Sequence, residues 1–404
     1  MAGIVPDHLG PAEAGAWRAT LCGLCASLVG IGLARFAYTP LLPAIIGAGW
    51  FGAAPAAYLG AANLAGYLAG ALLAGPAAAR TGARPMLRGA MLAASVSLLA
   101  CAWPGGFAWF FAWRFVSGVA GGVAMVLAAP TILPHVAPRR RGLVGGAIFT
   151  GVGLGIAASG TLVPLLLRQG LQHTWLGLGA AALALTLVAW NGWPEAGNGT
   201  AAPSPQARPG RLELRQLRLL YAGYGLNAFG LVPHMVFLVD YVARGLGQGL
   251  DAGASYWVLF GLGAVAGPLV TGHVADRIGF RPALRLLYLV EAAAVALPAL
   301  GAGSVALMAS SLVVGAATPG VVPLALGRTH EILRHHSAAQ KRAWSAATTS
   351  FAVMQATGAY GLSFLFARGG GDYRLLFGLG SAALVLALLA DLLVPTRSSS
   401  GQVE

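Results

Sequence analysis

Two stretches of the chain, 197 residues apart, are nearly the same sequence. Residues 75–88, GPAAARTGARPMLR, align with residues 272–285, GHVADRIGFRPALR, and eight of the fourteen positions are identical. Upstream of the two copies, Gly66 and Gly70 match Gly263 and Gly267 at the same offset. A repeat at half the length of a 404-residue chain indicates two homologous halves.

Each copy of the repeat is a basic turn between long apolar runs. The chain is 57% hydrophobic and 9% charged, whereas a soluble domain carries about 25% charged residues. Runs of this length suit a bilayer, and twelve can be counted, at about 18–41, 54–79, 86–104, 106–136, 142–167, 172–193, 217–242, 254–275, 283–302, 304–327, 343–366 and 373–394. The sequence therefore predicts an all-α integral membrane protein with 12 transmembrane helices in two six-helix halves. Two parallel halves of this kind are typical of transporters, in which the substrate site lies between the halves.

Lys and Arg are distributed unequally between the two sides of these segments. With both termini placed in the cytoplasm, nineteen of the 25 fall in inside loops, four fall outside, and Arg35 and Arg114 lie within spans. Because basic loops face the cytoplasm, we expect a multi-pass protein of the bacterial inner (cytoplasmic) membrane with both termini cytoplasmic. These loops account for the net charge of +13. That charge would suggest nucleic-acid binding in a soluble protein, but no nucleic-acid partner is expected here.

One break in composition divides the chain. Residues 194–215 are rich in Pro, Gly and Ser, which is typical of a flexible linker. We expect the following units: an N-terminal cytoplasmic tail (1–17), a six-helix half (18–193), the cytoplasmic linker (194–215), a second six-helix half (216–394) and a C-terminal tail (395–404).

The second copy of the repeat carries a recognisable loop pattern. Gly272-x-x-x-Asp276-Arg277-x-Gly279-x-Arg281 resembles the signature loop of the major facilitator superfamily. The first copy, with Gly75, Arg80, Gly82 and Arg84, has Ala79 where the acid is expected. A close helix approach at Gly272 would make this loop a gate together with a contact of Asp276. That contact is either an ion pair with Arg277 or Arg281 or an interaction with the N-terminus of a helix in the same half. The alternative is that these residues only set topology.

The first span resembles one branch of that superfamily. Residues 30–43, GIGLARFAYTPLLP, are similar to the YbfB/YjiJ-type branch. Arg35 lies deep in this span, where a charge is costly unless it faces a cavity or a partner. Substrate binding or proton coupling and a purely structural pair remain alternatives for Arg35.

Residues 114–122 provide a second arginine. Arg114-x-x-Ser117-Gly118-x-x-x-Gly122 resembles the superfamily's fourth-helix motif, whose arginine is associated with proton coupling in exporters. The resemblance implies that the helices of Arg35 and Arg114 line one cavity. Further polar candidates for the substrate or proton site are Tyr38, Asn63, Tyr67, Asn227, His234, Asp240 and Gln355.

Some of these assignments have simple alternatives. His234 is either a hydrogen-bonded structural histidine or a proton relay, and Asp240 either reaches the membrane interface or neutralises an arginine. Glu291 falls in a segment that the resemblance makes peripheral, and Asp391 lies near a helix end.

Motifs of other protein classes are missing from the sequence. There is no Walker-type loop or Gly-x-Ser-x-Gly, and His330-Glu331-Ile-Leu-Arg334-His335 lacks zinc-protease spacing. We therefore expect no enzyme, no cofactor and no metal, but a monomeric secondary active transporter that moves a small solute, with protons as a coupling partner, by alternating access. The first, second, fourth and fifth spans contain no acid, and the first and fourth each contain an arginine, which favours an organic anion as the solute. The alternative is a membrane sensor or a non-transporting protein of the same fold.

Overall fold

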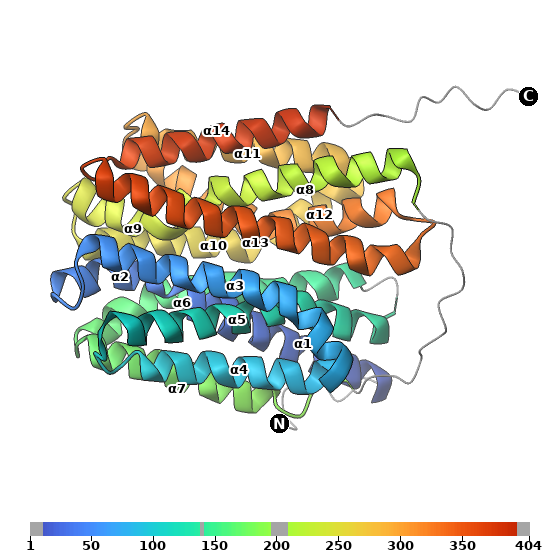
Figure 1. The fold of residues 1–404 in the computed structure, drawn as a ribbon, viewed down its shortest axis with the longest axis horizontal. Helices are drawn as coiled ribbons and strands as arrows, with labels where there is room; N and C mark the ends of the chain where they lie inside the picture. The colour runs from blue at the N-terminus through green and yellow to red at the C-terminus, as the bar shows by residue number, and fades with distance from the viewer. Residues whose placement is uncertain (1–10, 138–140, 195–208, 394–404) are drawn as a thin grey trace, which may run out of the picture.

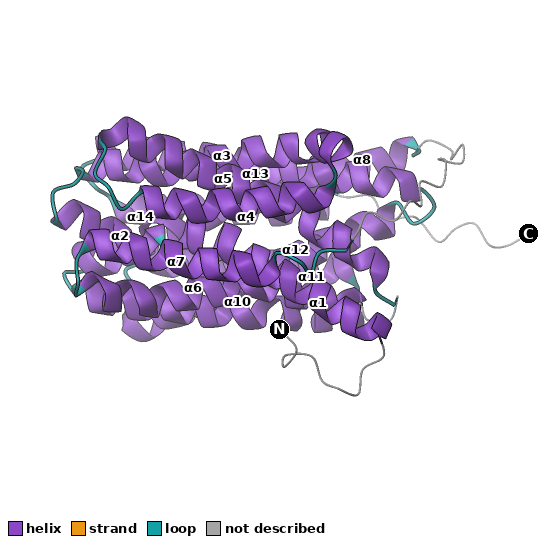
Figure 2. Ribbon diagram, turned by 90° about the horizontal axis from the view of Figure 1, so that it is seen from below, coloured by secondary structure: helices purple, strands orange, loops and turns teal. Residues whose placement is uncertain are grey.

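The structure is a computed structural model that describes residues 11–137, 141–194 and 209–393. These residues form helices joined by short turns and contain no strand (Figure 2). In chain order the helical elements are α1 (Pro11–Ser27), η1 (Leu28–Phe36), α2 (Tyr38–Gly47), α3 (Ala53–Thr81), α4 (Ala83–Ala100), α5 (Gly106–Ile132), η2 (Leu133–His135), α6 (Arg141–Leu167), α7 (Leu171–Ala189), α8 (Arg211–Val232), η4 (Pro233–Phe237), α9 (Leu238–Asp240), η5 (Tyr241–Gly245), α10 (Leu250–Ile278), α11 (Phe280–Ala299), α12 (Ser304–Ile332), α13 (Ser337–Arg368) and α14 (Tyr373–Leu392).

These elements make twelve long rods in two halves. The first rod is built from α1, η1 and α2, and the seventh from α8, η4, α9 and η5. Figure 1 shows α1–α7 as one layer and α8–α14 as the other. Ten rods are long and apolar enough to cross a bilayer by length and composition alone. Of the remaining two, α4 packs on α5 and α7, and α13 packs on α3 and α8.

The sequence repeat is explained by the way α3 packs on α5 and α10 packs on α12. A Cβ placed on Gly118 would lie 1.9 Å from the carbonyl oxygen of Asn63, and one on Gly315 would lie 2.0 Å from that of Phe260. Gly315 follows Gly118 by 197 residues, and Phe260 follows Asn63 by the same offset. The two halves thus repeat the same backbone-to-backbone contacts, which only glycine allows.

The turns after α3 and α10 also require glycine. Gly82 (φ +87°) and Gly279 (φ +85°) end these helices in a backbone conformation that residues with a Cβ rarely adopt. These turns, together with the start of α8 and the end of α14, lie at one end of the molecule, on the right of Figure 1. We call it the basic end, because Arg80, Arg277 and Arg281 belong to it.

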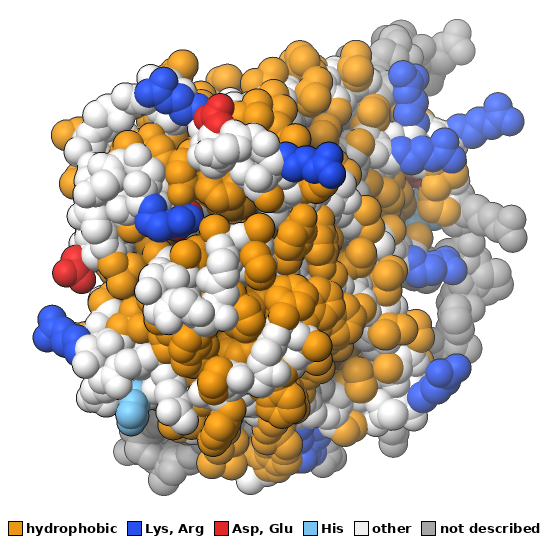
Figure 3. All heavy atoms as spheres, turned by 60° about the vertical axis from the view of Figure 1, so that its left-hand side comes forward, with side chains coloured by type: hydrophobic (Ala, Val, Ile, Leu, Met, Phe, Trp, Pro, Cys, Tyr) orange, Lys and Arg blue, Asp and Glu red, His pale blue; other side chains and the backbone are white. Residues whose placement is uncertain are grey.

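The surface between the two ends is apolar. Exposed leucines include Leu73, Leu187 and Leu289, and Figure 3 shows a broad hydrophobic surface with charged side chains toward its ends. With their hydrogen bonds satisfied within helices and their apolar side chains outward, these rods suit a lipid environment. The protein is a multi-pass membrane protein.

Two helices begin earlier in the sequence than the expected boundaries of the two halves. The first helix begins at Pro11, inside the expected N-terminal tail, because proline is well suited to the first helical turn. Helix α8 begins at Arg211, inside the expected linker, where the Glu213 carboxylate accepts a hydrogen bond from the Gly210 amide and caps the helix. The rest of the linker, 195–208, and both chain ends, 1–10 and 394–404, lie outside the described residues.

Candidate functional site between the two halves

A small cavity lies where the two halves meet. The first rod, α3 and α5 contribute most of its lining, and the second half contributes the rest: Arg35, Phe36, Tyr38, Thr39, Gly60, Leu64, Arg114, Met235 and Val236. Its volume is about 20 Å³, which is room for about one water molecule. In this conformation the cavity is therefore too small for an organic solute.

Arg35 connects the two halves at this cavity. Its Nη2 atom donates a hydrogen bond to Oε1 of Gln355, on α13 of the other half. The guanidinium carbon lies 5.0 Å from the ring centre of Tyr67 and 5.4 Å from that of Phe36, within cation–π range. The Nε atom is buried and has no hydrogen-bond partner in the described part of the chain.

Arg114 is the second buried arginine of the cavity. Its Nη1 atom donates a hydrogen bond of 2.6 Å to the carbonyl of Ala34, and its guanidinium lies 4.4 Å from the ring centre of Tyr38. Its Nε atom also lacks a partner within the described residues. Among those residues no Asp or Glu forms an ion pair with Arg35 or Arg114. Two positive charges thus share one cavity without a carboxylate.

The neighbouring polar side chains hold this arrangement in place. Asn63 donates from Nδ2 to the Ser117 hydroxyl, at 2.8 Å, and to the Arg114 carbonyl, at 3.3 Å. The Tyr38 hydroxyl donates to the carbonyl of Ala56 at 2.7 Å. These bonds fix the tyrosine ring over Arg114 and fix the turn of α5 that carries Arg114.

Both central rods change their helical geometry beside the cavity. The segment η1, which ends at Phe36, and the segment η4, which contains Met235, are π-helical. Pro233 explains the second case, since it lacks the amide hydrogen that an α-helix needs at that place. Such segments occur often at functional sites. Here the Met235 carbonyl accepts a hydrogen bond from Thr39 at 2.5 Å, a second bond between the halves.

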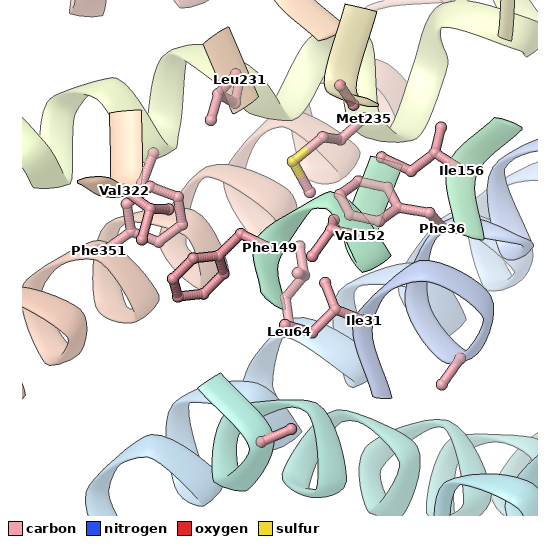
Figure 4. Close-up of a cluster of buried hydrophobic side chains, with 14 of the residues drawn as sticks. Ile31, Phe36, Leu64, Phe149, Val152, Ile156, Leu231, Met235, Val322 and Phe351 are labelled. Carbon is pink, nitrogen blue, oxygen red and sulfur yellow. The ribbon is translucent and has the colours of Figure 1, made fainter. Parts of the chain in front are cut away.

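Apolar side chains fill the centre beside the cavity. Figure 4 shows Phe149 of α6, Val322 of α12 and Phe351 of α13 in one cluster with Leu64 and Met235. All of them are buried. Because both halves contribute to the cluster, the halves must separate before a solute can pass through it to the cavity.

Three of the expected polar candidates lie elsewhere. Asn227 and His234 are buried inside the second half, where they bond to Glu291 and Ser310. Asp240 is 1% exposed and accepts hydrogen bonds from Arg244 and Tyr373. It therefore neutralises Arg244 and leaves Arg35 and Arg114 uncompensated.

The expected contacts of the signature loop are not made among the described residues in this conformation. A Cβ at Gly75 or Gly272 would meet nothing within 4 Å, so no helix approaches closely there. Close approach occurs at Gly66, Gly70, Gly263 and Gly267 instead, where helix backbones touch.

Asp276 is exposed, and no ion pair joins it to Arg277 or Arg281 in the described part of the chain. Arg281 instead lies 3.6 Å from a carboxylate oxygen of Asp391, and Nε of Arg285 donates to the same oxygen at 2.6 Å. The acid at this end is thus supplied by α14, because the end of that helix packs beside the start of α11.

Sequence reasoning underrated Glu291 and Asp391. A usable signal was present, because Arg281, Arg285, Tyr288 and Glu291 recur at spacings of four, three and three residues. This spacing puts them on one face of α11, and the structure turns that face inward toward α8 and α14.

The family is decided by a match over most of the chain. Residues 27–392 match a family model described as "Uncharacterised MFS-type transporter YbfB". The chain belongs to this family. It is thus a member of the major facilitator superfamily of transporters, as the residues around Arg35 predict, and no curated protein matches the chain significantly.

Solved structures agree with this fold. The chain is similar to the xylose transporter XylE from E. coli in a partially occluded inward-open conformation, with a TM-score of 0.70 and 14% identity over 94% of this chain and 100% of that chain. It is also similar to a D-xylose-proton symporter, with a TM-score of 0.72 and 17% identity over 95% of this chain and 97% of that one. At such identities the likeness shows the shared twelve-helix fold.

Proposed function

We propose that this family member is a secondary active transporter of the bacterial inner membrane that moves a small organic anion by alternating access, coupled to protons. The observation that carries the proposal is the pair of buried arginines, Arg35 and Arg114, which share a cavity without a carboxylate. A buried charge is costly unless it is paired. An anion in the cavity would supply the missing partner.

The two guanidinium groups suit a carboxylate in particular. Each retains an Nε–H group without a partner in the described part of the chain, and arginine binds carboxylates through two parallel hydrogen bonds. A cation would instead be repelled by both arginines in a medium of low dielectric constant. Asp240, the acid that could have offset this repulsion, is already bonded to Arg244.

Transport would require the halves to separate and reclose. The bonds from Arg35 to Gln355 and from Thr39 to Met235 join the halves beside a cavity too small for an organic solute. In the simplest transport cycle that fits this geometry, these bonds break when the solute enters and re-form once the solute is bound. We place the basic end in the cytoplasm, following the distribution of Lys and Arg, and we expect a monomer.

The test is solute uptake into proteoliposomes that contain the purified protein, with and without an imposed pH gradient. The panel should include monocarboxylates, dicarboxylates and organic cations, with D-xylose as the neutral comparison because a similar fold belongs to a D-xylose-proton symporter. We expect uptake of a carboxylate, and its loss in Arg35→Gln and Arg114→Gln, while Arg168→Gln, at an exposed arginine, transports normally. Selective uptake of a cation, or anion uptake that survives both substitutions, would refute the anion proposal. Binding without flux for every solute would favour a sensor.

A further inference from the structure

A second polar cluster lies inside the second half, outside the cavity. Glu291 on α11 is fully buried, and its Oε2 atom accepts a hydrogen bond of 2.6 Å from Nδ2 of Asn227 on α8. The remaining oxygens of the pair, Oε1 of Glu291 and Oδ1 of Asn227, are both buried and both lack a partner in the described part of the chain. Within the described residues, one amide–carboxyl pair thus holds two acceptors that lack a donor.

This carboxyl group is not compensated by a positive charge of the described residues. Within the described residues no Arg, Lys or His forms an ion pair with Glu291. The ionisable group that interacts with it is Tyr288 on its own helix. The other buried ionisable groups of the neighbouring elements are Tyr224 on α8, His234 on η4 and Asp391 on α14. Asp391 is paired with Arg285. The helices α10 and α12 carry their charged side chains near their ends, and α12 presents Ser310 and Ser311 to the interior.

His234 is uncharged in this arrangement. The Ser310 hydroxyl donates to the carbonyl of Ala294 at 2.7 Å. Its oxygen is therefore an acceptor for Nε2–H of His234, which lies 2.8 Å away. The other ring nitrogen, Nδ1, has no partner in the described part of the chain. His234 therefore supplies no cation to Glu291.

Protonation would satisfy both orphaned oxygens at once. An ionised carboxylate buried without a cation is very costly, whereas a neutral carboxylic acid gains an O–H donor. If Oε1 carries the proton, it can donate to Oδ1 of Asn227 while Nδ2 of Asn227 donates to Oε2. The acid and the amide then form a closed ring of two hydrogen bonds, and neither oxygen remains without a partner.

We propose that Glu291 is a proton-binding site, held as an uncharged carboxylic acid by a cyclic pair with Asn227, and that the transported proton occupies it. The second clause rests on the proposed proton-coupled transport, whereas the first does not. Helix α8 would connect this site with the cavity, because the rod that bears Asn227 also bears Met235. The sulfur of Met235 accepts a hydrogen bond of 3.3 Å from Gln355, and its carbonyl accepts one from Thr39.

Infrared spectroscopy of the full-length protein in lipid tests the first clause directly. At neutral pH we expect the carbonyl band of a protonated carboxylic acid, which shifts in D₂O. The band should be absent in Glu291→Gln, displaced in Asn227→Leu and unchanged in Glu331→Gln, which alters a surface glutamate paired with Arg328. Labelling the wild type with ¹³C-glutamate provides a measurement without any variant, since Glu291 is the buried glutamate among the described residues. If neutral pH gives no isotope-sensitive acid band, the proposal is wrong.

Uptake measurements test the second clause. With a solute that the wild type transports, Glu291→Gln should abolish the response of uptake to an imposed pH gradient, and Glu331→Gln should retain it. An unchanged response in Glu291→Gln would show that the acid is structural and would leave the transport proposal intact. Absence of transport for every solute would refute the proposed function, and the infrared result would still decide whether Glu291 binds a proton.

Discussion

The guanidinium of Arg35 donates a hydrogen bond to the side-chain oxygen of Gln355, although the two residues lie 320 positions apart and in different halves. The bond is buried, and it is made to a neutral amide. A neutral partner satisfies one donor of Arg35 but leaves its charge uncompensated. Gln355 therefore closes the cavity without competing electrostatically with an anionic solute.

This relationship predicts the effect of Gln355→Glu. The substitution keeps the side-chain shape and places a carboxylate beside Arg35, so that the protein supplies the negative charge itself. We expect anion uptake to fall tenfold or more, which corresponds to about 1.4 kcal/mol. Gln248→Glu, in an exposed turn, is the matched control and should transport normally. Undiminished anion uptake by Gln355→Glu would contradict this role of Arg35.

A second prediction concerns the glycines shared by the two halves. Gly118→Ala and Gly315→Ala would each place a methyl group about 2 Å from a backbone oxygen of the neighbouring helix. Overpacking usually costs about 1–3 kcal/mol, so both variants should lose stability to a similar degree. The measurement is the temperature at which purified protein ceases to elute as a single species after heating.

The controls for this experiment are Gly75→Ala and Gly272→Ala. A Cβ at either position meets nothing within 4 Å, and alanine in a helix interior is favoured over glycine by roughly 0.5–1 kcal/mol. These variants should be as stable as the wild type or slightly more so. Equal damage at all four positions would mean that the close helix contacts do not explain the repeat.

A third prediction separates two acids at the basic end. Asp391 is buried and bonded to Arg285, and hydrogen bonds to charged groups contribute about 1.5–3 kcal/mol. Asp391→Asn should therefore lower thermal stability, whereas Asp276→Asn should not, because Asp276 is exposed and forms no ion pair within the described residues. Asp276→Asn should slow uptake without abolishing solute binding if Asp276 acts as a gate in another conformation. A wild-type uptake rate would refute that gate.

The fold was predictable because its determinants are local or repeated. Apolar runs and basic loops define the twelve rods, and the offset of 197 residues reappears in the contacts of Gly118 and Gly315. The arginines of the cavity were also predictable, because a charge in an apolar span needs a cavity or a partner.

The partners of these residues were not predictable from the sequence. Whether Arg35 meets Gln355 or Asp240 depends on how the two halves dock, and no local pattern encodes that choice. Likewise, Asp276 follows the family pattern, but the arginines beside it bond to Asp391, which approaches only when α14 packs on α11. The family resemblance makes the helix of Glu291 peripheral and so ranks this acid low, although the residue spacing of α11 indicates a polar face.

The last prediction concerns the orientation of the molecule. If the basic end faces the cytoplasm, a membrane-impermeant maleimide applied to intact cells should label Gln248→Cys, at the opposite end, and should not label Glu331→Cys, at the basic end. Both positions are exposed. Cys22, Cys25 and Cys101 are each at most 2% exposed, so the wild type should give little background. Permeabilising the membrane should make Glu331→Cys reactive, which would show that its lack of labelling in intact cells reflects the side of the membrane on which it lies.

Ser204→Cys, in the expected linker outside the described residues, should behave like Glu331→Cys, because a linker that joins the sixth and seventh rods is expected on the same side as the basic loops. Labelling of Ser204→Cys or Glu331→Cys in sealed cells, with Gln248→Cys protected, would reverse the orientation.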